Sequence, residues 1–556
     1  MNPGFYLSLA SITLLLAMTA CSESELSARA QTTATSPRSP EAACTALNGM
    51  RIDASRIALP TTGATIRSAE LVSATAQGNA NGEYCKVLGA IHPATYSAPD
   101  INFEVNLPTE WNGKMLQFGG GGLNGTLVTG LGHYVKQPNS EPTPLARGYV
   151  TLSSDSGHQS AGGFDGRFYL NEEAMDNYGH MQIKKTHDVA VALIAARYDS
   201  VAQYSYFLGG SQGGHEGFDA LQRYPEDYDG VVAGYPAHNV LMLHLSALQF
   251  TRALMANDGR SWINPEKAAM FVAAVYETCD ALDAASDGII SNVAACLVAT
   301  AGFRSMTPDN PLRCDGGSDT GNSCLSDAQI EALVAFDQPY ETGFPIFADD
   351  QGTAVFPKWT PFEGSTFRDG GQVILGAQGP RGALQASPAD ATNRFAIARD
   401  LTLDVFTDFD ALAYAGRISD VAPRISANSV AIEPFRDRGG KLIYFHGLVD
   451  DFITPYSSIQ YYQRLQNRFG DTLGDFVRFY TIPGMGHVTG VFNARVSMLD
   501  ALEAWAENGI APAGITAVDA NQETAGRTRP VCHFPMWPRY NGSGDINSAE
   551  NFSCVR

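Results

Sequence analysis

Residues 209–213 carry the Gly-x-Ser-x-Gly pattern that surrounds a nucleophilic serine. A β-rich run, residues 204–208, precedes the pattern, and a helical stretch begins near residue 214, so the required strand–turn–helix context is present. Glycine two residues before and after the serine lets other backbone approach without a Cβ clash. We predict Ser211 as a nucleophile; the alternative is a tight turn with an unreactive serine.

A serine hydroxyl needs a base to take its proton, and the base needs a carboxylate to orient it. One late apolar run leads into a glycine-flanked loop that carries His487, and another leads into His446 and, four residues later, Asp450. We predict His487 as the base and Asp450 as the acid, with Asp451 as the runner-up. We expect His446 to order the acid loop. The order Ser, Asp, His is that of α/β-hydrolases.

The oxyanion formed in such a reaction needs two backbone N–H donors. One donor is expected from Gln212, directly after the nucleophile, and the other from a loop after an early strand. The glycine run 119–122 is such a loop, and we select Gly121 as its donor. A phosphate-binding loop would need a Gly-Lys-Ser or Gly-Lys-Thr ending, which is absent after these glycines.

Residues 279–290 place three carboxylates, Asp280, Asp283 and Asp287, within eight positions, followed by Gly288. Carboxylates this close repel one another unless a hard cation with oxygen ligands neutralises them. The spacing differs from that of the twelve-residue helix-loop-helix calcium site. From spacing alone, a calcium loop and a solvated acidic turn remain equal alternatives.

The N-terminus predicts export. Residues 5–20 form an apolar run too short for a membrane span, and small residues lead to Cys21. We predict a signal peptide over residues 1–20, lipidation of Cys21 and a periplasmic or outer-membrane lipoprotein; the alternative is a plain secretory signal. Residues 21–40, rich in Ser, Ala and Thr, are expected to be a flexible tether.

The cysteine count agrees with an oxidising compartment, because eight cysteines remain if Cys21 carries lipid. Eight cysteines allow 105 pairings, so spacing does not decide between them. Neighbours along the chain suggest the pairs Cys44–Cys85, Cys279–Cys296, Cys314–Cys324 and Cys532–Cys554.

Strands and helices alternate from residue 100 to 240, which predicts an α/β fold with a mostly parallel sheet. Between about 240 and 430 turn residues multiply, and afterwards the strand pattern resumes. We predict a core of residues 41–240 and 431–556, interrupted by an inserted lid of residues 241–430. The net charge of −21 argues against a nucleic-acid partner.

Seven segments together resemble the tannase and feruloyl esterase family of α/β-hydrolases, which includes mono(2-hydroxyethyl) terephthalate hydrolases. They are residues 119–125, 154–158, 209–214, 228–237, 279–290, 446–450 and 484–487. The resemblance implies an α/β-hydrolase core with a large lid, and it supports the four disulfides. It also implies a structural calcium ion held by the carboxylates of Asp280, Asp283 and Asp287 and the backbone oxygens of Ala285 and Ile289.

The chain departs from this family beside the nucleophile and the base. Many members have a disulfide there, but this chain has Gly210 and Val488 at the two places. We therefore expect packing alone to hold the loop of the base. In the lid, four residues are candidates for stacking on an aromatic acid or pairing with a carboxylate, or for ordinary core: Trp359, Phe362, Phe367 and Arg368.

These observations predict a secreted or lipid-anchored serine carboxylesterase for small-molecule esters of aromatic acids of the feruloyl, galloyl or terephthaloyl monoester type. Membrane contact is expected only through the N-terminal lipid. The alternatives are an esterase for aliphatic hydroxyalkanoate oligomers and a non-catalytic surface-binding lipoprotein.

Overall fold

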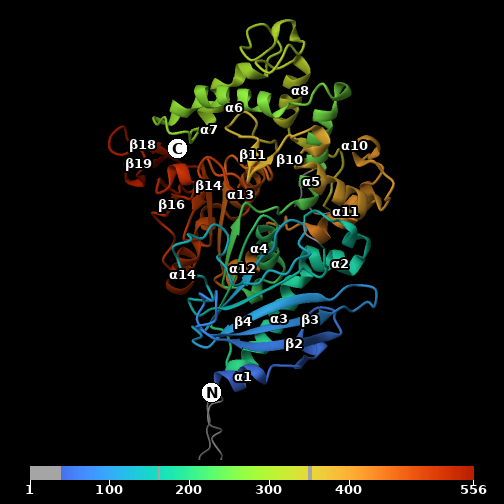
Figure 1. Ribbon diagram of the computed structural model, residues 1–556, viewed down its shortest axis with the longest axis vertical. Coiled ribbons are helices and arrows are strands. Elements are labelled where there is room, and N and C mark those ends of the chain that lie inside the picture. The colour runs from blue at the N-terminus through green and yellow to red at the C-terminus, as the bar shows by residue number, and fades with distance from the viewer. Residues whose placement is uncertain (1–38, 161–162, 348–353) are drawn as a thin grey trace, which may run out of the picture. The chain divides into compact units, whose positions relative to one another are not determined.

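The computed structural model describes residues 39–160, 163–347 and 354–556. Contacts unite Pro40–Arg556 into one compact unit, shown in Figure 1. The predicted signal peptide, Cys21 and residues 22–38 of the predicted tether lie outside the described residues. Helix α1 (Pro40–Thr45) begins at the last residue of that tether.

The main sheet of the described residues has ten strands in the order β1-β2-β3-β4-β6-β5-β7-β8-β13-β14. Strands β1 to β4 and β6 pair antiparallel, and those from β6 to β14 pair parallel. This arrangement confirms the predicted α/β class. The strands are β1 (Arg51–Ile52), β2 (Gly63–Val72), β3 (Tyr84–His92), β4 (Ile101–Pro108), β5 (Lys114–Phe118), β6 (Val150–Ser154), β7 (Tyr204–Gly210), β8 (Gly230–Gly234), β13 (Lys441–Gly447) and β14 (Val477–Ile482).

Helices cover both faces of the parallel strands. They are α3 (Gln182–Tyr198), α4 (Gln212–Arg223), α13 (Pro455–Phe469) and α14 (Met498–Asn508). Leu208 and Ile443 pack with Leu502 of α14, whereas their strand neighbours Phe207 and Leu442 pack with side chains of α4 and α13. Because both faces are buried, these strands are continuous apolar runs in the sequence.

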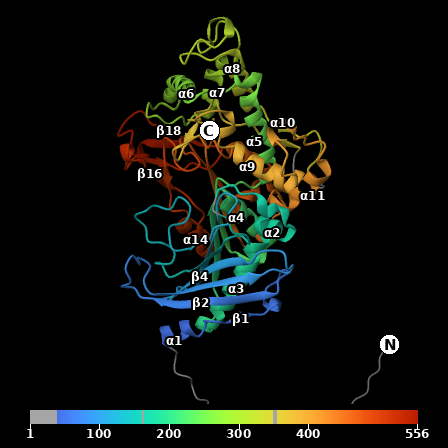
Figure 2. The same cartoon turned by 45° about the vertical axis from the view of Figure 1, so that its right-hand side comes forward.

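The segment between the neighbouring strands β8 and β13, residues 235–440, is here called the insertion; it contains the predicted lid. Its described residues add no strand to the main sheet. In Figures 1 and 2, α6, α7 and α8 lie far from the antiparallel strands β2 to β4. The elements of the insertion are α5 (Val240–Met255), α6 (Pro265–Cys279), α7 (Val293–Ala299), α8 (Asp327–Phe336), β9 (Tyr340–Glu341), β10 (Val355–Phe356), β11 (Arg368–Asp369), β12 (Gln372–Val373), α9 (Ala386–Ala391), α10 (Val405–Asp408), α11 (Ala415–Ile425) and α12 (Glu433–Asp437).

The predicted disulfides are confirmed: within the described residues the bonds are Cys44–Cys85, Cys279–Cys296, Cys314–Cys324 and Cys532–Cys554. Two of them lie in the insertion, and one closes the C-terminal region on itself. The remaining elements are α2 (Glu172–Asp176), β15 (Ala494–Arg495), β16 (Thr516–Asp519), β17 (Thr528–Pro530), β18 (Trp537–Tyr540) and β19 (Phe552–Val555). None of the helices in the described ranges is long and apolar enough to cross a membrane.

Candidate active site

Ser211 lies at the turn between β7 and α4, with φ 60° and ψ −123°. A positive φ of this size strains the backbone of any residue other than glycine, and such strain is typical of functional turns. The turn also needs its glycines. A Cβ on Gly209 would lie 2.4 Å from the carbonyl oxygen of Gly213, and a Cβ on Gly213 would lie 2.8 Å from that of Gly120. Close packing therefore requires the glycines of the motif. The turn that they allow places the Ser211 hydroxyl at the carboxyl end of the sheet.

The structure brings together the predicted nucleophile, base and acid. His487 Nε2 lies 2.9 Å from Ser211 Oγ, and His487 Nδ1 lies 2.9 Å from Asp450 Oδ2. A carboxylate only accepts, so Nδ1 carries the proton and Nε2 is left to accept the hydroxyl proton of Ser211. The rings of Tyr235 and Phe452 contact the imidazole edge-on, with centroids 4.8 and 5.1 Å away.

The Asp450 carboxylate is fully buried and held on both oxygens. Its Oδ1 accepts the backbone N–H groups of Phe452 at 2.9 Å and Ile453 at 2.8 Å, while Oδ2 faces His487. Burial alone would raise the pKa of Asp450, but the imidazoles of His487 and His446 hold that pKa well below its usual range. The group therefore stays ionised, as an acid that orients a base must.

The two alternative residues have other partners. Asp451 turns away from the imidazole, and its carboxylate accepts the hydroxyl of Ser365 and the N–H of Phe367, both in the insertion. Burial raises the pKa of Asp451 to about 8, despite the bond from Ser365. The His446 ring bonds to Ser458 Oγ at 2.8 Å and to the carbonyl of Ile453 at 2.9 Å, which orders the acid loop as expected.

Most of the N–H groups at the two ends of the glycine loop after β5 have acceptors, and those in its middle do not. The N–H of Gly119 donates to the carbonyl of Leu208 at 3.0 Å, and that of Gly120 donates to Glu216 at 2.9 Å. Within the described part of the chain, the N–H groups of Gly121, Gly122 and Leu123 have no backbone acceptor, and neither has that of Gln212. Gly121 and Gln212, the donors selected from the sequence, are therefore available, but so are the two residues after Gly121.

Glu216 is a site residue that the sequence pattern did not reveal, because 96 residues separate it from Gly120, whose N–H it accepts. Its buried carboxylate also accepts from the side-chain amide of Asn124, so it holds the glycine loop at two points, Gly120 and Asn124. Burial raises the pKa of Glu216 to about 7, although both of these bonds oppose the shift.

The lid candidates divide into two kinds. Trp359, Phe362 and Phe367 are buried in the hydrophobic core of the insertion, and the Trp359 indole donates to Ser246 at 3.0 Å. Arg368 is exposed, and none of the described carboxylates forms an ion pair with it. Of the four, it is the side chain that is free to meet a ligand.

The place of the family disulfide is filled by side chains. A Cβ on Gly210 would lie 2.5 Å from Val135 Cγ2 and 2.9 Å from the ring of Tyr235, and the side chain of Val488 is 57% exposed. A cysteine pair therefore has no room here without movement of Val135 or Tyr235.

The expectation that packing alone holds the loop of the base is wrong. We call residues 484–490 the base loop. The Asp369 carboxylate in the insertion accepts the N–H groups of Val488 and Thr489, both at 2.6 Å, and the hydroxyl of Thr489 at 2.8 Å. Lys136 Nζ donates to the carbonyl of Val488 at 2.8 Å. Spacing gave no sign of either residue.

The predicted calcium loop follows α6 and wraps on its own carboxylates. Asp280 accepts the N–H of Gly288 at 2.9 Å, and Asp283 accepts that of Ser291 at 3.0 Å. Asp287 accepts the N–H of Ile289 at 3.0 Å. The donor set consists of oxygen atoms alone, which suits a hard cation.

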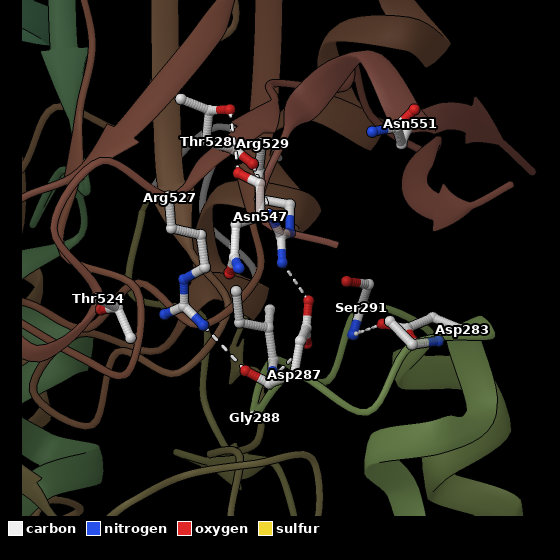
Figure 3. Close-up of polar contacts among 12 residues, drawn as sticks. Asp283, Asp287, Gly288, Ser291, Thr524, Arg527, Thr528, Arg529, Asn547 and Asn551 are labelled. Atoms are coloured by element: carbon white, nitrogen blue, oxygen red, sulfur yellow. Dashed lines mark hydrogen bonds and ion pairs between the residues drawn. The ribbon is translucent and has the colours of Figure 1, made fainter. Parts of the chain in front are cut away.

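Charge is concentrated in this loop and only partly balanced. Burial, with the charge of Asp287 adding to it, raises the pKa of Asp283 to about 6 and also raises that of Asp280. Figure 3 shows Arg529 pointing at the Asp287 carboxylate and Arg527 donating to the Asp287 carbonyl. Arg529 pairs with Asp287, and within the described residues no cationic side chain forms an ion pair with Asp280 or Asp283, so the loop fits an added calcium ion.

Another acidic cluster lies elsewhere. Among the described residues, three potential metal-ligating side chains come within 4.8 Å of one another at His187, Asp188 and Asp227, not at the calcium loop. There, Lys184 Nζ donates to Asp188 at 2.7 Å and to Asp227 at 2.9 Å, so the cluster already contains its cation. Ligands of a calcium ion need not lie within 4.8 Å of one another, because oxygens on opposite sides of the ion are about 5 Å apart. In the calcium loop, backbone carbonyls would complete the ligand set.

Comparison with known proteins gives one consistent result. The family model described as tannase and feruloyl esterase matches residues 85–555. The chain is 36% identical over 531 residues to an uncharacterised esterase of Agrobacterium fabrum, covering 93% of this chain and 94% of the relative. It is 31% identical over 537 residues to the mono(2-hydroxyethyl) terephthalate hydrolase of Piscinibacter sakaiensis, covering 87% and 86%.

The fold is that of a solved relative. The crystal structure of feruloyl esterase B from Aspergillus oryzae aligns with a TM-score of 0.74 at 24% identity, covering 93% of this chain and 100% of that chain. Because the family match spans most of the sequence, the protein belongs to the tannase and feruloyl esterase family and is a carboxylic ester hydrolase.

Proposed function

We propose that the protein hydrolyses esters of aromatic carboxylic acids through an acyl-enzyme on Ser211. The observation that carries this proposal is the His487 imidazole, which bridges Ser211 Oγ and Asp450 Oδ2 at 2.9 Å on each side. Ser211 Oγ attacks the ester carbonyl carbon while His487 Nε2 takes the hydroxyl proton. Asp450 stabilises the resulting imidazolium and keeps its ring in place.

The negative oxygen of the tetrahedral intermediate meets the N–H groups of Gly121 and Gln212. The C–O bond to the alcohol then breaks, and His487 returns its proton to the leaving oxygen. A water molecule repeats the sequence on the acyl-enzyme: His487 takes its proton, its oxygen attacks the acyl carbon, and Ser211 leaves with the proton back on Oγ. The acid is released and the enzyme is regenerated.

The aromatic acyl group is inferred from the relatives, whose names specify feruloyl esters and mono(2-hydroxyethyl) terephthalate. Arg368 supports a terephthaloyl monoester among these, because its exposed guanidinium is next in sequence to Asp369, which contacts the base loop. Arg368→Met should raise KM for mono(2-hydroxyethyl) terephthalate, which has a free carboxylate, and leave methyl ferulate hydrolysis unaffected. Equal effects on both esters would exclude a carboxylate contact.

The test of the whole proposal is Ser211→Ala, with Ser318→Ala as a control at an exposed serine of the insertion. Loss of a nucleophile of this kind costs ~10⁶ in turnover. Turnover of p-nitrophenyl acetate should vanish in Ser211→Ala and in wild-type protein treated with a fluorophosphonate, with melting unchanged. A folded Ser211→Ala variant that retains turnover would exclude the mechanism. Methyl ferulate, methyl gallate, mono(2-hydroxyethyl) terephthalate and a hydroxybutyrate dimer then decide the acyl group.

The proposed enzyme binds one structural calcium ion through Asp280, Asp283 and Asp287, with the backbone oxygens of Ala285 and Ile289. The raised pKa values of Asp280 and Asp283 support this site, because a bound cation would relieve the repulsion that contributes to them. The loop shares no hydrogen bond with Ser211, His487 or Asp450 within the described residues, so calcium has a role in stability.

The protein is proposed to act outside the cytoplasm. The disulfide bonds support an oxidising compartment. The finer proposal is a lipoprotein anchored through Cys21 after removal of residues 1–20, with simple secretion as the alternative. Labelling of the expressed protein with a palmitate analogue, in wild type and Cys21→Ala, distinguishes the two.

A further inference from the structure

The base loop is held through its backbone rather than through a side chain. The N–H of Val488 belongs to the peptide unit that joins it to His487, and this N–H donates to Asp369 Oδ2 at 2.6 Å. The next N–H, that of Thr489, donates to Asp369 Oδ1 at 2.6 Å. One carboxylate from the insertion therefore holds the main chain directly behind the imidazole.

We propose that Asp369 is a positioning residue that sets the place of the His487 imidazole between Ser211 and Asp450. The inference rests on the proposed role of His487 as the base. Asp369 touches neither substrate nor the reacting atoms and acts through the main chain of the base loop.

The surroundings of Asp369 are built for this contact. Its side chain is 5% exposed, and its donors are two N–H groups and the Thr489 hydroxyl, which matches an ionised carboxylate that only accepts. Gly486 leaves the space, since a Cβ there would lie 3.2 Å from Asp369 Cγ. The N–H of Gly370 donates to Thr489 Oγ1 at 3.0 Å, so the insertion grips the loop at a second point.

Lys136 completes the hold from the other side. It is buried in the loop between β5 and β6, and its Nζ donates to the carbonyl of Val488 at 2.8 Å. The N–H of Val488 is thus fixed by the insertion and its C=O by the core. Because Val488 itself projects into solvent, its side chain contributes little to this arrangement.

Small displacements of this loop matter because the imidazole has two partners at once. Both His487 contacts are 2.9 Å long, so a shift that shortens one lengthens the other. A misplacement of about 1 Å by a change outside the reacting groups costs about 10²-fold in rate. A mobile base loop therefore lowers kcat, whereas binding of the ester in the ground state is affected little.

Asp369→Asn tests the proposal, because the variant keeps the shape of the side chain but turns one acceptor oxygen into an N–H₂ donor that faces an N–H. The matched control is Asp400→Asn. Asp400, in the insertion but exposed, likewise accepts an N–H and a hydroxyl, both from Thr402, at 2.8 and 2.7 Å. We expect kcat for p-nitrophenyl acetate to fall about 10²-fold in Asp369→Asn, with KM and the melting temperature close to those of the control. An unchanged kcat, or a rise in KM alone, overturns the proposal.

A second pair of variants covers the case in which Asp369→Asn does not fold. Thr489→Val loses the hydroxyl that donates to Asp369 and accepts from Gly370, and Thr489→Ser restores it. We expect kcat to fall in the valine variant and to return in the serine variant; equal kcat in both overturns the proposal. His487→Ala distinguishes failure of the proposed function from failure of the positioning role. If His487→Ala stays active, the proposed function is wrong. If it is inactive while Asp369→Asn and Thr489→Val have normal activity, only the positioning role of Asp369 is wrong.

Discussion

Asp450→Asn is the substitution for which the structure determines the outcome most completely. In the native chain Oδ1 accepts two N–H groups, from Phe452 and Ile453. The variant must keep its amide oxygen at that place, because an N–H₂ there would face two other donors. Its N–H₂ therefore takes the place of Oδ2, 2.9 Å from His487 Nδ1.

The consequence is a change of tautomer. With a donor facing it, Nδ1 must accept, so the imidazole proton moves to Nε2 and points at Ser211. A base in this form has no lone pair for the hydroxyl proton, although every heavy atom remains in place. Such a substitution costs ~10⁴ in turnover. At 1.36 kcal/mol for each factor of ten, the barrier rises by about 5.4 kcal/mol.

The assay is steady-state hydrolysis of p-nitrophenyl acetate, with melting curves to show that each variant is folded. Asp451→Asn is the control, because it changes the neighbouring buried carboxylate, whose partners are in the insertion. Its turnover should stay close to that of the wild type. If Asp450→Asn remains active while Asp451→Asn is inactive, the assignment of the acid is reversed.

Four further predictions concern stability and the oxyanion loop. Chelation should lower the melting temperature, and calcium at ~100 times its Kd should restore about 2.7 kcal/mol; an unchanged melting curve would indicate a solvated turn. Mild reductant should lower the melting temperature, since a native disulfide contributes ~2–5 kcal/mol, but it should leave turnover at low temperature unchanged. Loss of turnover at a temperature where the protein is still folded would contradict this. Burial raises the pKa of Asp451 in the folded state to about 8, above its unfolded value. The free energy of unfolding of the wild type, measured with urea, should therefore fall relative to that of Asp451→Asn as the pH rises from about 4 to 8. Parallel plots of this free energy against pH would refute the shift. Glu216→Gln should lower kcat by up to ~10²-fold, the cost of one misplaced oxyanion donor, and an unaltered kcat would show that Gly121 is held otherwise.

The central parallel strands and the nucleophile turn could be predicted because local sequence determines them. Strands buried on both faces are apolar runs, so the predicted run 204–208 lies within β7, and the glycines around Ser211 are required by contacts within a few ångströms. The antiparallel strands β1 to β3 were not predicted. The ten residues of β2 mix buried and exposed positions without strict alternation, and its pairing with β3 contains a register shift.

Contacts between distant segments were the part that the sequence did not reveal. Asp369 is 119 residues from Val488, and Lys136 is 352 residues from it, so no spacing rule connects them. The aromatic residues of the insertion had the composition of a ligand pocket, but Trp359 and Phe362 turned out to be core. An aromatic side chain has the same residue type in either role, and its burial depends on the tertiary structure.

The contacts of residues 365–370 imply that the insertion is not a detachable cover. Ser365 and Phe367 bond to Asp451 in the acid loop, and a few residues later Asp369 bonds to the base loop. A shortened protein that joined β8 directly to β13 would keep the nucleophile turn but lose an anchor of each of the other two loops. The smallest active form of this enzyme therefore includes the insertion. Replacing the insertion by that of a relative should preserve ester hydrolysis only where the relative's insertion has a stretch equivalent to residues 365–370.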